Sequence, residues 1–113
     1  MECIFCQIVA GKIPADIVYQ DDSFLAFRDI HPQSPKHVLI VPKAHIASLT
    51  KATIGQRELL GNLLLLAKEL AEREKVAAKG YRVVINSGSE GGQIVPHLHL
   101  HLLGGKKLND LLG

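Results

Sequence analysis

Three histidines, His97, His99 and His101, alternate with single leucines near the end of the 113-residue chain. In a β-strand, side chains alternate between the two faces, so this spacing predicts all three imidazoles on one face and the leucines on the other. The chain has six histidines, and folding alone gives no reason to gather half of them on one strand. Because a neutral imidazole can be a nucleophile, a proton carrier or a metal ligand near neutral pH, the strand is predicted to be a chemical site.

The loop that leads into this strand could hold an anion. Residues Asn86 to Gln93 include several glycines, and such loops present backbone N–H groups at close range, which suits a phosphate or another anion. A plain hairpin connection is the alternative for the loop taken alone. Its position favours the anion, because an anion held there would lie beside imidazoles that can attack or protonate it.

The elements that would position these residues follow from hydrophobic periodicity and turn residues. A short helical turn is predicted over Cys3–Val9, and one long helix over about Ile54–Lys79. The predicted strands are Ile17–Gln20, Phe24–Arg28, His37–Val41, Tyr81–Asn86 and His97–Leu103. This order predicts an α+β fold in which an antiparallel sheet carries the long helix on one face.

The long helix has boundary signals and a broad apolar side. Thr53 with Gln56 three residues later fits a capping box, and Gly80 fits the C-terminal stop. The apolar stripe at helical spacing consists of Leu59, Leu60, Leu63, Leu64, Ala67, Leu70 and Ala71. Leu65 and Leu66 widen this stripe. Two interpretations stay open: a core helix, or a helix that also packs against a second subunit.

Length and composition indicate one globular domain over residues 1–113. The formal net charge is +2 and the lysines are scattered, so nucleic acid is not expected as a partner. The longest wholly apolar runs, such as Leu63–Ala67, are much shorter than the roughly 20 residues of a membrane helix, so no membrane association is expected. Met1-Glu2-Cys3 lacks the basic start of a secretion signal, and a cytoplasmic location is expected.

The histidine strand also carries a family resemblance. The run His97–Leu103 resembles the signature of the histidine triad (HIT) family, and other segments resemble its Hint branch. These segments are Ile4-Phe5, Ile13-Pro14-Ala15, Asp21-Asp22, Ala26–Ile30, Pro32–Pro35, His37–Lys43, Gly80–Arg82, Asn86–Gly88 and Gly91–Gln93. The resemblance implies a single HIT domain: a five-stranded antiparallel sheet, one long helix and a short N-terminal helix. It also implies a homodimer in which the long helix and the fourth strand join two sheets.

The resemblance implies hydrolysis of purine nucleoside phosphoramidates, or related nucleoside monophosphate derivatives, through a covalent nucleotidyl-histidine. His99 would attack the α-phosphorus, since a neutral imidazole with one fixed tautomer is a competent nucleophile. His101 would bind or protonate the phosphate end, and His37 would orient its neighbours from the adjacent strand. This scheme requires no metal ion for catalysis.

The same resemblance implies a purine nucleotide site on one face of the sheet. The purine would lie in an apolar slot made by Ile4, Phe5, Ile8, Phe27, Ile30 and Leu39. Asp29 would accept hydrogen bonds from the ribose hydroxyls. The phosphate oxygens would be held by Asn86, Gly92, Gln93, Val95, His99 and His101. The alternative is core packing for the apolar residues, and a turn residue for Asp29.

Cys3 and Cys6 are the only cysteines and have the spacing C-x-x-C. In a cytosolic protein this spacing indicates a metal site or a redox pair more often than a structural disulfide. A thioredoxin-like pair would follow a strand, whereas this pair lies at the N-terminus. HIT proteins that carry zinc use a cysteine pair and two histidines, and the positions that resemble those histidines are His45 and His97. A structural zinc is therefore expected on these four residues; the alternative is two reduced cysteines.

Other functions stay open. One is a dinucleoside polyphosphate hydrolase, as in the Fhit branch. Another is a metalloenzyme that gathers the three histidines of the strand, or two of them with His37, around a catalytic zinc. The last is a nucleotide-binding adaptor with vestigial activity. Ile94 stands where the Hint branch often has a serine or threonine that contacts the leaving group, and the tail Asn109–Gly113 lacks a Trp-Pro-Pro ending. The preferred leaving group is therefore undetermined.

Overall fold

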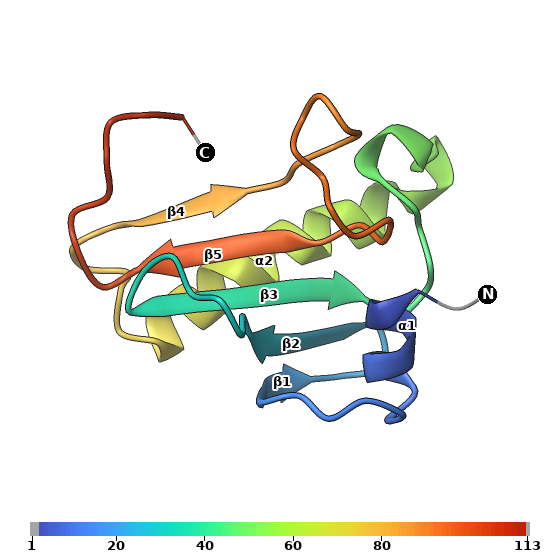
Figure 1. The fold of residues 1–113 in the computed structure, drawn as a ribbon, viewed down its shortest axis with the longest axis horizontal. Helices are drawn as coiled ribbons and strands as arrows, with labels where there is room; N and C mark the ends of the chain where they lie inside the picture. Colours follow the sequence, from blue (N-terminus) through green and yellow to red (C-terminus); the bar gives the residue numbers. More distant parts are fainter. Residues whose placement is uncertain (1–2, 113) are drawn as a thin grey trace.

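The computed structural model describes residues 3–112; Met1, Glu2 and Gly113 of the predicted domain lie outside the described residues. The helices are α1 (Ile4–Val9) and α2 (Arg57–Arg73), with 3₁₀ turns η1 (Leu49–Lys51) and η2 (Ile54–Gln56). The strands are β1 (Ile17–Gln20), β2 (Phe24–Arg28), β3 (Lys36–Pro42), β4 (Tyr81–Val84) and β5 (Leu100–Gly104). They form an antiparallel sheet in the order β1-β2-β3-β5-β4 (Figure 1). The predicted α+β fold with a long and a short helix is confirmed.

Alternating side chains give the two faces of the sheet different environments. Leu98, Leu100 and Leu102 are each at most 1% exposed and pack in the core beneath α2. The same core contains Phe24, Ala26, Val38, Ile40, Leu63, Leu66, Ala67, Leu70 and Ala71. The intervening histidines take the opposite face, as the alternation predicts.

The short helix α1 packs on this opposite face, across the sheet from α2 (Figure 1). Its Phe5 is buried against Leu25, Phe27, Leu39 and Val41, which alternate with the residues that face α2. This second cluster is the smaller of the two, and it lies toward one end of the central strands. The remainder of the face above β3 and β5 is therefore available for a site.

The histidine strand is shorter than predicted. β5 begins at Leu100, so His97 and His99 lie in the segment that leads into the strand. The alternation nevertheless extends through this segment, because Leu98 donates its backbone N–H to the Ile46 carbonyl at 2.6 Å and stays buried. His97 and His99 therefore lie on the predicted face of the sheet, although this segment lacks the regular backbone hydrogen bonds of a β-strand.

The long helix also ends earlier than predicted, at Arg73 rather than at Lys79. Two residues later, Lys75 adopts a left-handed backbone conformation with a φ of 64°. This reversal brings Val76 into the core at 4% exposure, against Gly104 of β5. A Cβ atom at Gly104 would lie only 2.9 Å from Val76, so the close approach requires glycine. Burial of Val76 accounts for the early end of the helix.

The N-terminal boundary of α2 and its set of buried apolar residues differ from the prediction in detail. Thr53 and Gln56 form the predicted capping box, but around the 3₁₀ turn η2 that precedes α2. Leu64, which the prediction placed in the stripe, is 54% exposed, and Leu66 is buried instead. Among the described residues, every helix is too short or too polar to cross a membrane.

Candidate active site and metal centre

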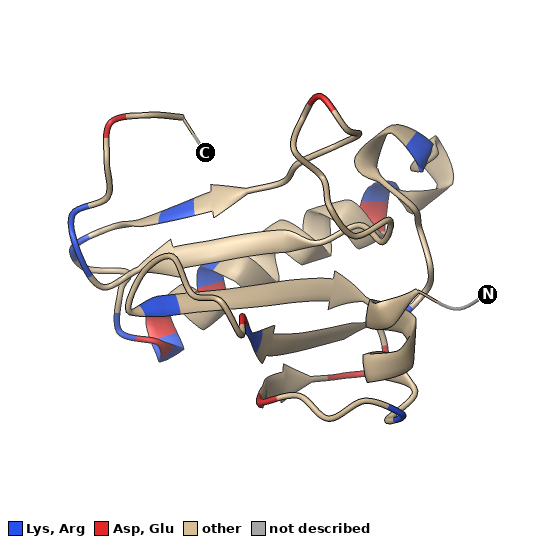
Figure 2. Cartoon of the chain, viewed as in Figure 1, with Lys and Arg blue, Asp and Glu red and all other residues tan. Residues whose placement is uncertain are grey.

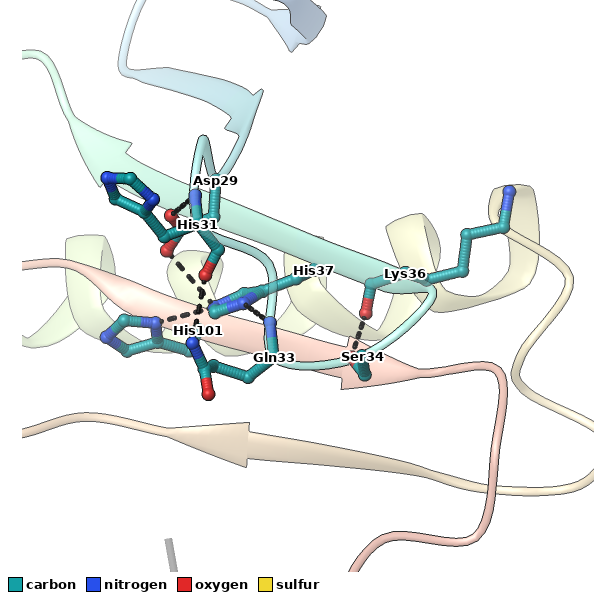
Figure 3. A network of polar contacts seen from close by, with 7 residues as sticks. All are labelled: Asp29, His31, Gln33, Ser34, Lys36, His37 and His101. Atoms are coloured by element: carbon teal, nitrogen blue, oxygen red, sulfur yellow. Dashed lines mark hydrogen bonds and ion pairs between the residues drawn. The ribbon is translucent and has the colours of Figure 1, made fainter.

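The imidazoles of His37 and His101 meet above the two central strands. His37 comes from β3 and His101 from the neighbouring β5, and the two rings point toward each other (Figure 3). His37 Nε2 lies 2.9 Å from His101 Nδ1. Asp29, just after β2, places Oδ2 3.4 Å from the same His37 nitrogen. Side chains from, or just after, three neighbouring strands, β2, β3 and β5, thus meet at one point.

Hydrogen bonds determine which nitrogen of each ring carries the proton. The backbone N–H of Gln33 donates to Nδ1 of His37 at 3.0 Å, so the proton of the neutral His37 ring lies on Nε2. That N–H donates to Nδ1 of His101, which leaves the His101 proton on its own Nε2. The row of donors therefore ends in an N–H group of His101 that can donate to a bound molecule.

The pKa values of both rings favour the neutral form. Burial lowers the pKa of His37, and the nearby carboxylate of Asp29 opposes this effect. Burial, followed by the neighbouring rings of His99 and His37, lowers the pKa of His101 to about 4. At neutral pH the pair therefore works as a hydrogen-bonded relay of uncharged imidazoles.

The loop between β2 and β3 is held by its own hydrogen bonds (Figure 3). Asp29 Oδ1 accepts the backbone N–H of His31 at 2.8 Å, and the Gln33 side chain donates to the His31 carbonyl at 3.0 Å. The hydroxyl of Ser34 donates to the Lys36 carbonyl at 2.6 Å. These contacts place the Gln33 N–H group that fixes the proton on the β3 histidine.

His99 has the geometry of a nucleophile. Its Nδ1 lies 2.7 Å from the carbonyl oxygen of His97, and because a carbonyl can only accept, Nδ1 carries the proton. Nε2 therefore keeps a free lone pair. The ring is 6% exposed, and the rings of Phe5 and His101 lie on two sides of it at centroid distances of 5.1 and 5.0 Å. The tautomer and the orientation of His99 are both fixed.

A cavity of about 530 Å³ opens above these histidines. Of the residues predicted to bind the nucleotide, those that line it are Ile4, Phe5, Ile8, Phe27, Asp29, Ile30, Leu39, Asn86, Gly92, Val95, His99 and His101. Its apolar wall comes from α1, β2 and β3, and its polar wall includes the histidines. The structure thus gathers in one cavity residues that are spread over almost the whole sequence.

Gln93 is absent from the lining of that cavity. Its side-chain amide donates to the carbonyls of Ala47 and Val95 at 2.7 and 2.9 Å, and its Oε1 accepts the Gly88 N–H at 2.9 Å. Its own backbone N–H donates to the Gly88 carbonyl. Gln93 therefore holds the loop in place instead of facing the cavity.

Several lining residues were not among those predicted to bind the nucleotide. Ile13, Pro14 and Ala15 lie before β1 and line the cavity, as do His31 and Ile94. Ile13, Pro14 and Ala15 form an apolar segment outside every predicted helix and strand, and this property could have indicated that they line a cavity. Ile94 is 91% exposed and adds a hydrophobic rim.

A second cluster lies behind Phe5, where Cys3, Cys6, His45 and His97 converge. Cys3 Sγ lies 3.3 Å from His97 Nδ1, and Cys6 Sγ lies 3.2 Å from His45 Nδ1. The two histidine Nδ1 atoms are 3.2 Å apart. Nε2 of His97 lies 2.8 Å from the Pro42 carbonyl, so it carries the ring proton and leaves Nδ1 available as a ligand.

These distances match a tetrahedral zinc site. With Zn–N bonds of about 2.0 Å and Zn–S bonds of about 2.3 Å, a tetrahedron has N···N edges of roughly 3.3 Å and S···N edges of roughly 3.5 Å. The four S···N distances in the cluster run from 3.2 to 3.6 Å. The donor set, two thiols and two imidazoles, is one that zinc favours in structural sites. The cluster could therefore hold a metal ion such as zinc.

The arrangement differs from that of a catalytic metal held by the whole triad. Nδ1 of His97 faces the two cysteines, whereas His99 and His101 face the cavity. Among residues 3–112, a further group close enough to share an ion is Asp29, His37 and His101, which a hydrogen bond between the two rings and a 3.4 Å contact of Asp29 with His37 already join. His99 belongs to neither group, so the geometry separates the candidate metal ligands from His99.

Known proteins share this arrangement of elements. The sequence pattern of the HIT domain matches residues 10–108. The chain belongs to the HIT family. A crystal structure of a HIT family hydrolase from Legionella pneumophila has a TM-score of 0.96 and 50% sequence identity, and covers 99% of this chain and 100% of that chain. A histidine triad protein from Clostridium difficile has a TM-score of 0.95 and 42% identity, and covers 98% and 96%.

Sequence relatives agree with the structural ones. The purine nucleoside phosphoramidase of Escherichia coli is 45% identical over 111 residues, which are 98% of this chain and 93% of the relative. An uncharacterised HIT-like protein of Synechococcus elongatus is 54% identical over 107 residues, which are 95% and 93% of the two chains. The HIT chain therefore aligns with these proteins over nearly its full length.

The depressed pKa of His101 predicts its titration. In an NMR pH titration, the ring protons of native His101 should shift with a midpoint of about 4, whereas in urea the midpoint should be about 6.5. Because the folded pKa is the lower one, native stability should fall as the pH drops from about 6.5 to about 4. A His101→Gln variant identifies the signal, and a native midpoint near the unfolded value would contradict the assignment.

Proposed function

We propose that this HIT chain hydrolyses purine nucleoside phosphoramidates, or related nucleoside monophosphate derivatives, through a nucleotidyl intermediate on His99. The observation that carries the proposal is the hydrogen bond from His99 Nδ1 to the His97 carbonyl, because it leaves Nε2 unprotonated at the cavity wall. The 45% identity to the E. coli purine nucleoside phosphoramidase supports the substrate class. The substrate is therefore a nucleotide that carries an amine on phosphorus.

The nucleoside half would occupy the part of the cavity between α1 and the sheet. Phe5 and Phe27 pack edge to face with ring centroids 5.5 Å apart and offer an apolar surface for a planar base. Asp29 lies at the rim, where its oxygens already contact His31 and His37. Each carboxylate oxygen has further acceptor capacity, which the two ribose hydroxyls can use.

The phosphate would lie beside His99 and His101, within reach of the loop over residues 92–95. Gly92 and Gln93 use their backbone N–H groups within the loop, but no hydrogen bond among the described residues engages the N–H groups of Ile94 and Val95. These two N–H groups, rather than those of Gly92 and Gln93, are the donors we assign to the phosphate oxygens. Donors already in position stabilise the charge that develops in the transition state.

The loop that carries these donors closes tightly around Asn86. The Asn86 side-chain amide donates to the Gly91 carbonyl at 2.7 Å, which leaves its second N–H for a phosphate oxygen. A Cβ atom at Gly91 would collide with the Ser87 carbonyl, so this turn needs glycine. Asn86 therefore both shapes the loop and can bind the phosphate.

In the first step, His99 Nε2 attacks phosphorus, the N–P bond to the ring forms and the P–N bond to the amine breaks. The bound phosphate raises the pKa of His101, since negative charge favours the protonated ring. His101 can then give a proton to the departing amine, which takes the electron pair of the broken bond. In the second step, water attacks the nucleotidyl-histidine and returns a proton to His101, and His99 leaves with its lone pair restored.

Replacement of the nucleophile should abolish turnover. We expect His99→Ala to lower kcat on an adenosine phosphoramidate by about 10³-fold or more, because the covalent route is lost. In the unaltered protein, rapid acid quench followed by intact-mass spectrometry and peptide mapping should show an adenylyl group on His99.

Chemical rescue provides the control for this experiment. A His99→Gly variant leaves space for free imidazole, which should restore part of the turnover, while His99→Ala without imidazole should stay inactive. Normal hydrolysis by His99→Ala, or an adenylyl group found on another residue, would refute the mechanism.

We also propose that Cys3, Cys6, His45 and His97 hold a structural zinc. A metal bound there would crosslink α1 to the segments that follow β3 and precede β5. This link bears on the active site because Phe5, within α1, contacts the rings of His97 and His99 at centroid distances of 6.0 and 5.1 Å. The site would thus maintain the cavity wall without taking part in the reaction.

Zinc content tests the metal centre. Protein purified without chelator should contain one zinc per chain by elemental analysis, and a C3S/C6S variant should contain none. The loss should lower the free energy of unfolding by on the order of several kcal/mol, because a structural metal is coupled to folding. His31→Asn, outside the cluster, is the matched control and should keep its zinc. Full zinc content in C3S/C6S would exclude this ligand set.

We propose a homodimer formed through β4 and the adjacent side of α2. β4 is an edge strand of the sheet, and Tyr81 and Val83 on it are 38% and 37% exposed. Leu64 of α2 is 54% exposed, and Lys68, one turn further along that side, interacts electrostatically with Tyr81. An exposed apolar patch beside an unpaired strand edge favours pairing of two copies.

Two neighbouring leucines of α2 allow a matched test of the dimer. Leu64→Glu should convert the dimer to a monomer in light scattering, because it puts a charge into the proposed contact. Leu65→Glu should leave the mass unchanged, since Leu65 is similarly exposed but borders a hollow beside Tyr19 on the opposite flank. A monomeric unaltered protein, or equal effects of the two variants, would argue against this interface.

A further inference from the structure

A second cavity, of about 730 Å³, lies beside the first on the same face of the sheet. The two cavities share Gln33, His37, Asn86 and His101 in their linings. His99 lines only the first cavity, and Leu103 lines only the second. Since residues 99, 101 and 103 follow one another along one face, the cavities are arranged in tandem, with His101 at the boundary.

The second cavity is basic. Among the described residues, Arg82, Lys106 and Lys107 line it, together with one carboxylate, that of Asp110. Basic segments mark β4 and the chain that follows β5 at this end of the sheet (Figure 2). The second cavity also has apolar lining residues, Val84, Leu103 and Leu108, but the rings of Phe5 and Phe27, which line the first cavity, have no aromatic counterpart there among the described residues. The two halves of the site therefore suit ligands of different chemistry.

Arg82 is the best positioned of these cations. It lies opposite Leu103 in the β4–β5 register and is partly buried. Its guanidinium donates to the backbone carbonyl of Asn109 at 2.5 Å and to the Asn109 side chain at 3.4 Å, so the tail holds it in place. A guanidinium has five N–H donors, which leaves others for a ligand. Lys107, by contrast, is highly exposed and 3.8 Å from Asp110.

The direction in which the leaving group departs connects the two cavities. In an in-line displacement, the leaving group departs on the side of phosphorus opposite the nucleophile. With the nucleoside in the first cavity and phosphorus held beside His99 and His101 at the boundary, a leaving group on the side of phosphorus away from His99 can extend past His101 into the second cavity. Ile94 has no polar side-chain atom to offer a leaving group and lines only the first cavity.

We propose that the second cavity is a leaving-group subsite that selects amines bearing an anionic group, a carboxylate or a phosphate, and that Arg82 is its specificity-determining residue. This inference rests on the proposed function and deepens it. The P–N bond breaks as the His99–P bond forms, the amine nitrogen takes the electron pair and a proton from His101, and the anionic end of the amine stays paired with Arg82. Lys106 and Lys107 add positive charge around the pair.

Substrates that differ in one group test the subsite. Adenosine 5′-phosphoramidates of β-alanine and of n-propylamine have leaving groups of similar length, but only the first carries a carboxylate. We expect kcat/KM to be about tenfold or more higher for the β-alanine compound, as one charge-assisted contact provides. The phosphoramidate of 2-aminoethyl phosphate carries a phosphate in place of the carboxylate. Whichever of the two anionic compounds has the higher kcat/KM shows whether the subsite prefers a carboxylate or a phosphate.

Arg82→Met should reduce the ratio of the two kcat/KM values to near one, whereas Arg82→Lys should retain part of it. A residue with a purely structural role would change both rates and leave the ratio intact. Arg57→Met removes an exposed arginine from the far end of α2 and should keep the ratio of the unaltered protein. An unchanged ratio in Arg82→Met would overturn the assignment of Arg82, and equal rates for the first two compounds would overturn the subsite.

Failure of the proposed function has a separate signature, namely that no phosphoramidate is hydrolysed. Calorimetric binding of the same compounds to the His99→Ala variant then tests the subsite without turnover. Tighter binding of the β-alanine compound, lost in the His99→Ala/Arg82→Met variant, supports the subsite. Equal binding of the charged and uncharged compounds overturns it.

Discussion

The hydrogen bond from His99 Nδ1 to the carbonyl of His97 is the constraint on which the site depends. It fixes the tautomer of His99, and it makes the backbone position of His97 part of the chemistry. The His97 ring is itself held on both nitrogens, by the Pro42 carbonyl and by the cysteine cluster. One buried residue therefore links the cysteine–histidine cluster to the orientation of His99 through a single peptide carbonyl.

A second constraint acts on protons rather than on position. The Gln33 N–H, His37 and His101 form a row in which each group donates to the next. Burial disfavours charge on these rings, so the row orients a proton without an ion pair. A neutral donor can approach a nucleotide phosphate and take on positive charge only when the phosphate is present. The pair of histidines can thus receive an anion without carrying cationic charge of its own.

The sequence could predict the features of the site that depend on the alternation of side chains between the two faces of a strand. The spacing of His97, His99 and His101 predicts their common face, although the regular strand begins only at Leu100. The end of α2 could not be predicted, because Val76 leaves helical spacing to fill a space that only the folded sheet creates beside Gly104. The basic cavity was hidden for the same reason: its cations come from β4 and the tail, which are distant in sequence from the histidines.

The leucines between the histidines keep the imidazoles on one face, although the regular strand begins only at Leu100. Leu98 and Leu100 are at most 1% exposed, and a shift of one residue would move them to the cavity and bury two imidazoles in the α2 core. Burying polar rings without partners costs on the order of several kcal/mol, whereas each leucine stabilises the core by about 2 kcal/mol. The hydrophobic effect therefore sets the register that places His99 at the cavity wall. The same alternation thus buries the leucines in the α2 core and places the imidazoles at the cavity, so a shift of one residue would disturb both.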